Sequence, residues 1–119
     1  IKCIVIASGN DASVAMAEHI AGSETAFVEK MNLKAEELGM KNTNFVNPTG
    51  LHHENHYTTI SDLVKLCKYA IELPNFLDIA SQDVYYIPAT NKHEKRRGKR
   101  LVFSFYFSDK LYRLHYLQV

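Results

Sequence analysis

Three residues near the start of the chain, Ser8, Gly9 and Asn10, have types and a spacing that could serve chemistry. An apolar run, Ile1–Ala7, leads into them, and a stretch typical of an amphipathic helix follows. Gly9 permits a sharp or left-handed turn, and on such a turn the Ser8 hydroxyl and the Asn10 carboxamide can face one cleft. The alternative is a plain helix cap, because Asn10 and Asp11 are both good N-cap residues and three-letter motifs recur by chance.

A second group of potential ligands lies between His52 and His56, where three histidines accompany Glu54. Zinc-binding helices use the pattern H-E-x-x-H, and the spacing here is one residue too short. The turn formed by Pro48 and Gly50 just before this segment favours a loop, so the histidines would not share one helical face. We therefore expect a solvated or locally hydrogen-bonded loop and no metal site.

Composition sets wide bounds on the function. The chain has 119 residues, of which 46% are hydrophobic, and a formal net charge of +1. One domain with a modest core is expected, and the charge gives no global attraction to nucleic acid or membranes. Cys3 and Cys67 lie in apolar runs, where a free cysteine is usually a small buried residue; a disulfide between them has no support. The sequence contains no signal peptide and no apolar run of 18 residues.

Five sequence blocks carry a family resemblance. They are ASGNDASVAMAEHIAGS (Ala7–Ser23), AFVEKMN (Ala26–Asn32), ELGMKNTNFVNPTGL (Glu37–Leu51), ENHYTT (Glu54–Thr59) and YYIPATNKHE (Tyr85–Glu94). In content and order they resemble the low-molecular-mass penicillin-binding proteins, the serine D-alanyl-D-alanine carboxypeptidases of peptidase family S11. The superfamily signature has three parts: S-x-x-K, S-D-N or a relative of it, and K-T-G.

Only the middle part of that signature is present, as Ser8-Gly9-Asn10. In the family the S-x-x-K box lies upstream of S-G-N and the K-T-G box lies downstream. The chain also begins at Ile1 without a methionine, so we expect a fragment. The resemblance implies an α/β fold, namely a fragment of the serine β-lactamase/DD-peptidase-like fold that holds mainly its helical region. Residues 1–94 would be the central part of the catalytic domain, and residues 95–119 a basic and aromatic tail without family resemblance.

The resemblance also implies a reaction. In the family, the serine of S-x-x-K attacks the carbonyl between two D-alanines of a peptidoglycan stem peptide, and the neighbouring lysine acts as base. Ser8 matches the second serine, which relays a proton between that lysine and the leaving amine. Asn10 matches the residue that hydrogen-bonds the substrate backbone and helps to fix the lysine. No metal or organic cofactor is implied, and the fragment itself is expected to be inactive.

The implied partners are the peptidoglycan pentapeptide stem and, in the intact parent, β-lactams. We expect no nucleic acid, membrane association only through parts outside this chain, and an extracytoplasmic location in the cell envelope. The alternative function is a non-catalytic module that binds peptidoglycan peptides.

Patterning predicts a mainly helical chain. Ile1–Ala7 reads as a strand or a buried helix end, and the resemblance favours the helix. Further helices are expected over 11–21, from the cap Ser23 to Leu38, and after Thr59, where Asp62 would complete a capping box. In that last helix Leu63, Leu66, Cys67, Ala70 and Ile71 follow a helical period and are expected to be buried.

The C-terminal part is expected to contain short extended segments. A helical turn should occupy 75–80, and Val84–Pro88 has the composition of a strand. The run from Lys95 to Arg100 is strongly basic, and Leu101–Tyr106 is a second candidate for extended structure. Basic residues beside aromatic ones can bind single-stranded nucleic acid or an anionic membrane, but a solvated loop is the more ordinary interpretation of such a short run.

Overall fold

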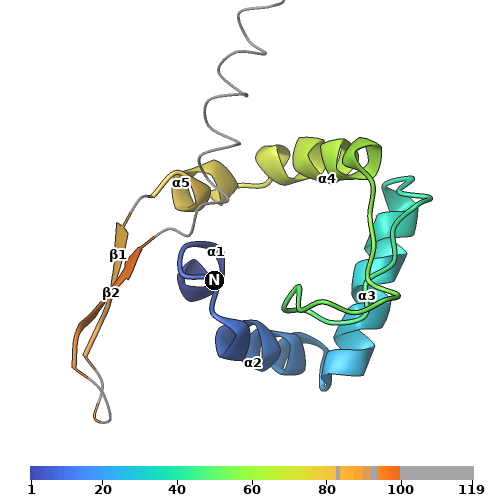
Figure 1. Ribbon diagram of the computed structural model, residues 1–119. Helices are drawn as coiled ribbons and strands as arrows, with labels where there is room; N and C mark the ends of the chain where they lie inside the picture. Colours follow the sequence, from blue (N-terminus) through green and yellow to red (C-terminus); the bar gives the residue numbers. More distant parts are fainter. Residues whose placement is uncertain (83, 90, 92–93, 100–119) are drawn as a thin grey trace, which may run out of the picture. The chain divides into compact units, whose positions relative to one another are not determined.

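The computed structural model describes residues 1–82, 84–89, 91 and 94–99. Its elements, in chain order, are α1 (Lys2–Val5), α2 (Asn10–Ala21), α3 (Glu24–Glu37), α4 (Ile60–Glu72), α5 (Phe76–Ala80), β1 (Val84–Ile87) and β2 (Arg96–Lys99) (Figure 1). These elements form two compact units. One comprises residues 1–8 and the described residues between Leu77 and Lys99, and the other comprises Gly9–Phe76.

The first unit combines α1 with a two-stranded hairpin. Strands β1 and β2 pair antiparallel, with Val84 opposite Lys99 and Ile87 opposite Arg96. The helical interpretation of the first residues is confirmed by α1. The expectation that this helix is buried was wrong for its own residues; burial begins at Ile6, which is 1% exposed.

The basic run after Glu94 does not form the solvated loop that we expected, because Arg96–Lys99 is strand β2. β1 consists of Val-Tyr-Tyr-Ile, residue types that favour strands. Its backbone needs a hydrogen-bonding partner, and the basic segment supplies one. The expected extended segment at 101–106 lies outside the described residues.

In the second unit, α2 and α3 form a helical pair whose connection follows the predicted signals. Gly22 ends α2 at φ 83°, and its N–H donates to Glu18 O at 2.7 Å. Glycine suits this left-handed position because it has no Cβ. Ser23 then caps α3, its Oγ accepting from the Ala26 N–H at 3.1 Å. α2 and α3 contact each other, and each helix has one buried residue, Ala17 in α2 and Ala35 in α3.

Helix α4 begins where predicted, since the Thr59 Oγ1 accepts from the Asp62 N–H at 3.2 Å. The expected burial of its apolar face was wrong: Leu63 and Ile71 are 39% and 37% exposed. They belong to an apolar stripe of α4, spaced for one helical face, that consists of Ile60, Leu63, Val64, Cys67 and Ile71. The polar side of α4 makes the contacts within the unit instead, through Asp62 and Lys65.

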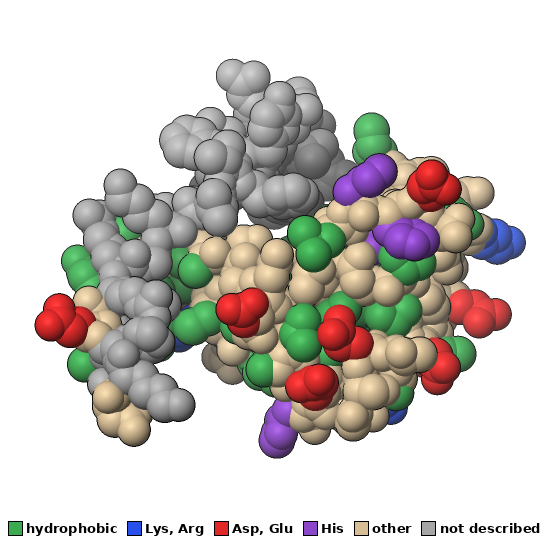
Figure 2. Space-filling model, turned by 60° about the horizontal axis from the view of Figure 1, so that its bottom comes forward, with side chains coloured by type: hydrophobic (Ala, Val, Ile, Leu, Met, Phe, Trp, Pro, Cys, Tyr) green, Lys and Arg blue, Asp and Glu red, His purple; other side chains and the backbone are tan. Residues whose placement is uncertain are grey.

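The described part of the chain has a small core. Its buried apolar residues are Ile6, Ala17, Ala35 and Met40, whereas many large hydrophobic side chains reach the surface (Figure 2). Among the described helices, none combines the length and apolar character needed to cross a bilayer. Many large apolar side chains in the described part of the chain are therefore exposed.

Candidate active site

Ser8 has an unusual backbone conformation. Its φ is 50°, in the left-handed region that L-residues other than glycine seldom adopt. The Ser8 N–H donates to Ile4 O at 3.0 Å, which continues the turn of α1, and the residue is exposed. The sequence would allow Gly9 a sharp or left-handed backbone, but Gly9 has φ −74°, and the left-handed residue is the serine. Strained residues of this kind cluster at functional sites.

Gly9, and neither Asn10 nor Asp11, is the N-cap of α2. The expectation of an Asn10 or Asp11 cap was wrong, because the helix already includes Asn10 as its first residue. The Ser13 N–H and the Ser13 Oγ both donate to Gly9 O, at 3.0 and 3.1 Å. The exposed Asn10 carboxamide is therefore not used to cap the helix, and it remains available to a ligand.

The long connection between α3 and α4 forms a closed loop beside α3 (Figure 1). Its ends meet where Asn44 and Tyr57 exchange backbone hydrogen bonds of 2.9 and 3.1 Å. Asn32 of α3 binds the same loop, donating to Phe45 O and accepting from the Phe45 N–H, both at 2.8 Å. Because the ends of this loop are hydrogen-bonded to each other and Asn32 binds it to α3, the position of the loop against the helix is fixed.

At the tip of this loop, the predicted turn at Asn47-Pro48-Thr49-Gly50 is present. The Asn47 Oδ1 accepts from the Thr49 N–H at 3.2 Å, the Thr49 Oγ1 at 3.0 Å and the Gly50 N–H at 2.8 Å. Gly50 has φ 77°, which glycine adopts without strain. An asparagine that binds the backbone two and three residues ahead stabilises a tight turn without help from neighbouring elements.

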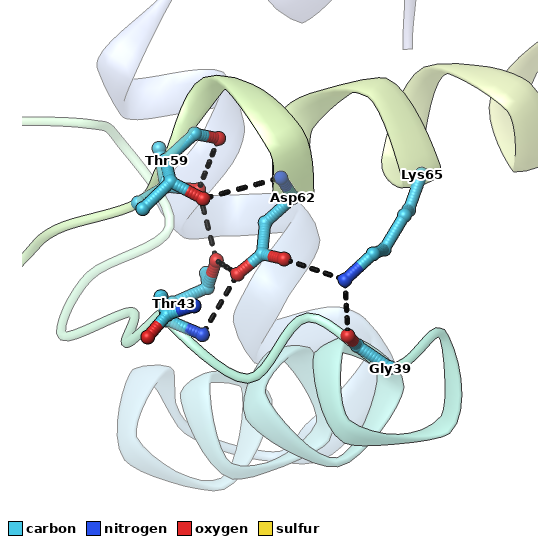
Figure 3. Close-up of polar contacts among 7 residues, drawn as sticks. Gly39, Thr43, Thr59, Asp62 and Lys65 are labelled. Atoms are coloured by element: carbon cyan, nitrogen blue, oxygen red, sulfur yellow. Dashed lines mark hydrogen bonds and ion pairs between the residues drawn. The ribbon is translucent and has the colours of Figure 1, made fainter.

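Asp62 joins α4 to the start of this loop (Figure 3). Its carboxylate is 1% exposed and accepts from the Asn42 N–H at 2.8 Å, the Thr43 hydroxyl at 3.0 Å and the Lys65 Nζ at 2.8 Å. Lys65 also donates to Gly39 O. The hydrogen bond from Lys65 lowers the pKa of the Asp62 carboxyl; burial opposes this shift, and the bonds from Asn42 and Thr43 support it.

Only half of the predicted capping box is thus formed. Thr59 caps the helix as expected, but the Asp62 carboxylate binds the preceding loop rather than the start of its own helix. The T-x-x-D spacing could have drawn attention to Asp62, although not to its partners. Asn32 gave no such signal, because an asparagine within a helix has no predictable long-range partner.

The histidine segment is a turn. The His53 Nδ1 accepts from the Asn55 N–H at 3.1 Å, and the His56 ring packs edge-on against Phe45 with centroids 5.6 Å apart. Within the described residues, His, Cys, Asp and Glu side chains form no group of three that could hold a metal ion. Cys3 and Cys67 are both free, and burial raises the pKa of the Cys67 thiol, which makes it a poor nucleophile.

A shallow, open depression of about 420 Å³ lies on α3, lined by Glu29, Asn32, Leu33 and Glu36. It includes neither Ser8 nor Asn10, and Asn32 there already binds Phe45. The depression therefore does not identify the site, and the Ser8–Asn10 turn stays the candidate on grounds of chemistry.

Comparison with known proteins decides the family. The sequence model of the D-alanyl-D-alanine carboxypeptidases, peptidase family S11, matches residues 1–107. The chain belongs to this family. The match extends beyond Glu94, the last residue of the five sequence blocks that carry the family resemblance. The division of the chain into residues 1–94 and 95–119 stays a prediction.

Two curated carboxypeptidases illustrate the relationship. Over 68 residues the chain is 63% identical to D-alanyl-D-alanine carboxypeptidase DacF of Bacillus subtilis, a match that covers 57% of this chain and 18% of DacF. Over 104 residues it is 40% identical to DacC of Escherichia coli, covering 87% of this chain and 25% of DacC. The S11 chain therefore spans only a minor part of these relatives.

Solved structures agree on the fold. Penicillin-binding protein 5 of Haemophilus influenzae has a TM-score of 0.73 and 36% identity, over 83% of this chain and 27% of that one. The Streptomyces K15 DD-transpeptidase has a TM-score of 0.75 and 24% identity, over 90% and 45%, and shows the fold alone. The predicted family and fold class are confirmed: the chain holds a mainly helical part of the penicillin-binding protein fold, and its family is one of cell-wall hydrolases.

Proposed function

We propose that this stretch supplies the Ser-Gly-Asn side of the active site in a longer serine-type D-Ala-D-Ala carboxypeptidase. That enzyme would remove the terminal D-alanine from peptidoglycan stem peptides and would be acylated by β-lactams. The observation that carries the proposal is the Ser8-Gly9-Asn10 segment, which leads into α2 and supplies Asn10 as its first residue, in a chain of family S11. Its serine is exposed at φ 50°, and its asparagine does not cap the helix.

In the proposed reaction, a serine outside this chain attacks the carbonyl carbon between the two D-alanines, and its proton passes to a neighbouring lysine. The tetrahedral intermediate collapses, the C–N bond breaks, and the amine of D-alanine leaves with a proton. Ser8 would relay this proton, since a hydroxyl both donates and accepts hydrogen bonds. Water then hydrolyses the acyl ester and releases the shortened peptide.

Asn10 would bind the peptide backbone of the substrate and help to orient the lysine. A carboxamide offers two N–H donors and one carbonyl acceptor, so it can bind a peptide backbone and the lysine together. Because Asn10 is the first residue of α2, the helix fixes its backbone, and only its side chain has to adjust. We propose that this chemistry uses no metal or cofactor. We also propose that the complete enzyme is located in the cell envelope.

The 119-residue chain contains neither an S-x-x-K nor a K-T-G sequence. We therefore expect the purified chain to release no D-alanine from diacetyl-Lys-D-Ala-D-Ala. Release that is lost on Ser8→Ala would contradict this expectation. Binding of stem peptide without hydrolysis would favour the alternative function, a non-catalytic peptidoglycan-binding module.

The roles of Ser8 and Asn10 can be tested in a complete enzyme. The matching stretch of Bacillus subtilis DacF, 63% identical, would be replaced by the residues of this chain. The hybrid should be active, and Ser8→Ala should lower its turnover about 100-fold or more, as for other proton-transfer groups. Asn10→Ala should also lower kcat/KM, whereas the exposed control Ser61→Ala should not. An inactive hybrid, or an unchanged Ser8→Ala variant, would overturn the proposal.

A further inference from the structure

The Gly9 carbonyl, directly before helix α2, accepts two hydrogen bonds from a single residue. The Ser13 N–H donates to it at 3.0 Å, and the Ser13 Oγ donates to it at 3.1 Å. Ser13 is half-buried in the second turn of the helix. The bond from the hydroxyl is not needed to form α2, because the bond from the N–H already closes the first helical turn.

The residue restrained in this way is the one with the greatest backbone freedom. A glycine can adopt more conformations than any other residue, and Gly9 has no side chain with which to cap α2. Helices α3 and α4 are capped by Ser23 and Thr59, whose side chains accept from the helix backbone. At the start of α2 the side-chain bond comes from within the helix instead, from Ser13.

This restraint reaches Asn10 through the peptide plane. Because the peptide bond is planar, the Gly9 carbonyl, the Asn10 N–H and the Asn10 Cα move together. Two bonds that converge on the Gly9 oxygen limit rotation of this plane, and with it the direction in which the Asn10 side chain leaves the backbone. Asn10 is exposed, and no described residue hydrogen-bonds its carboxamide. Its position therefore depends on the backbone that carries it.

We propose that Ser13 is a positioning residue for Asn10: its hydroxyl holds the peptide plane from which the Asn10 carboxamide reaches the substrate. This inference rests on the proposed function, in which Asn10 binds the substrate backbone and the lysine. Both contacts need the carboxamide within a narrow range of positions, since a small displacement of a binding group lowers the rate strongly. Ser13 touches neither the substrate nor the lysine and acts only through Gly9 and Asn10.

The effect of Ser13 on stability separates positioning from a merely structural role. Alanine has a higher helix propensity than serine, and a serine that bonds the carbonyl four residues back slightly destabilises a helix. Ser13→Ala keeps the N–H bond to Gly9. In the 119-residue chain this variant should therefore leave the midpoint of urea unfolding unchanged or raise it, so that a loss of activity does not reflect a loss of the fold.

Activity is measured in the DacF hybrid described above. Ser13→Ala should lower its kcat/KM about 3- to 10-fold, the range that one hydrogen bond supplies. Ser13→Thr keeps a hydroxyl that can bond the same carbonyl, so it should restore most of the activity. In a variant that already carries Asn10→Ala, Ser13→Ala should change kcat/KM by less than about twofold, because no carboxamide is left to position. The control Ser61→Ala makes the same change at an exposed position of α4 and should have no effect.

The outcomes distinguish this inference from the proposed function. A hybrid that loses turnover on Ser8→Ala but not on Ser13→Ala would overturn the inference and leave the proposed function standing. Equal loss from Ser13→Ala with and without Asn10→Ala, no recovery in Ser13→Thr, or a fall in the unfolding midpoint that accounts for the lost activity would also overturn it. An inactive hybrid would overturn the proposed function, and this inference with it.

Discussion

The Asn32 carboxamide and the Phe45 backbone are joined by two hydrogen bonds of 2.8 Å, one in each direction. Asn32 lies on α3 and Phe45 on the loop that leads to α4, so the side chain pairs with the loop as a neighbouring strand would. Asp62 binds the same loop from α4, through Asn42 and Thr43. Two polar side chains on different helices thus determine where this loop lies.

Replacing Asn32 should therefore destabilise the second unit. Asn32→Ala removes both hydrogen bonds and leaves the part-buried Phe45 N–H and C=O without their partner. At about 0.5–1.5 kcal/mol for each bond, the free energy of unfolding should fall by about 1–3 kcal/mol in urea titrations. Asn55→Ala, at an exposed position of the same loop, is the control and should stay close to wild type. Equal stability of the two variants would show that the Asn32–Phe45 hydrogen bonds contribute nothing to stability.

The cap of α4 gives a second prediction. The Thr59 Oγ1 accepts from the Asp62 N–H, one of the helix N–H groups that has no partner within the helix. Thr59→Ala should lower the free energy of unfolding by about 1 kcal/mol, while Thr59→Ser keeps the oxygen and most of the stability. Thr25→Ala at an exposed position of α3 is the comparison. A serine variant as unstable as the alanine variant would argue against capping as the cause.

Asp62 should make stability depend on acid. Its carboxyl pKa is lowered in the folded chain from the ordinary value of 3.8, chiefly by the Lys65 hydrogen bond. A lowered pKa means that the stabilisation is complete above the ordinary value and is lost as the pH falls through the folded value. In acid titrations followed by circular dichroism, Asp62→Asn should remove this component. Lys65→Met should shift this acid-induced loss of stability to higher pH. An unchanged pH profile in both variants would contradict the role given to the Asp62 carboxyl.

Whether a contact of this fold could be predicted from the sequence depends on how far apart its two partners lie along the chain. Gly22, Ser23 and Thr59 act on backbone groups within a few residues, so their roles followed from local pattern. The loop residues that Asn32 and Asp62 bind lie 13 to 20 residues away in the chain. No local signal specifies such partners.

The errors have the same origin. The period of α4 correctly indicated one apolar face but could not show that the opposite face, with Asp62 and Lys65, is the one that contacts the loop. The charges of Arg96 and Arg97 suggested a solvated loop, although the backbone of β1 pairs with this segment. At the candidate site, residue types indicated Ser8 and Asn10 as candidates, which stay predictions, but not that the serine rather than Gly9 has positive φ.

The conformation of Ser8 leads to a test that separates stability from chemistry. At φ 50° an L-residue is strained by about 1–2 kcal/mol and glycine is not. Ser8→Gly should therefore be more stable than Ser8→Ala, by about 0.5–1 kcal/mol once the greater freedom of unfolded glycine is included. In the DacF hybrid both variants should lose activity alike, because both lack the hydroxyl. If activity followed stability instead, Ser8 would be a structural residue and not a relay.

The apolar stripe of α4 should cause self-association of the isolated chain. Val64 is 48% exposed and Ile71 37%, and both lie on the same helical face as Ile60 and Leu63. Contiguous apolar surface of this kind favours association in water. Sedimentation velocity should show oligomers that increase with concentration, and Val64→Lys/Ile71→Lys should shift the chain toward monomer. Leu33→Lys, at a 59% exposed site on α3, is the control and should leave the oligomers in place. A wild-type chain that is monomeric at all concentrations would show that the stripe is tolerated in water.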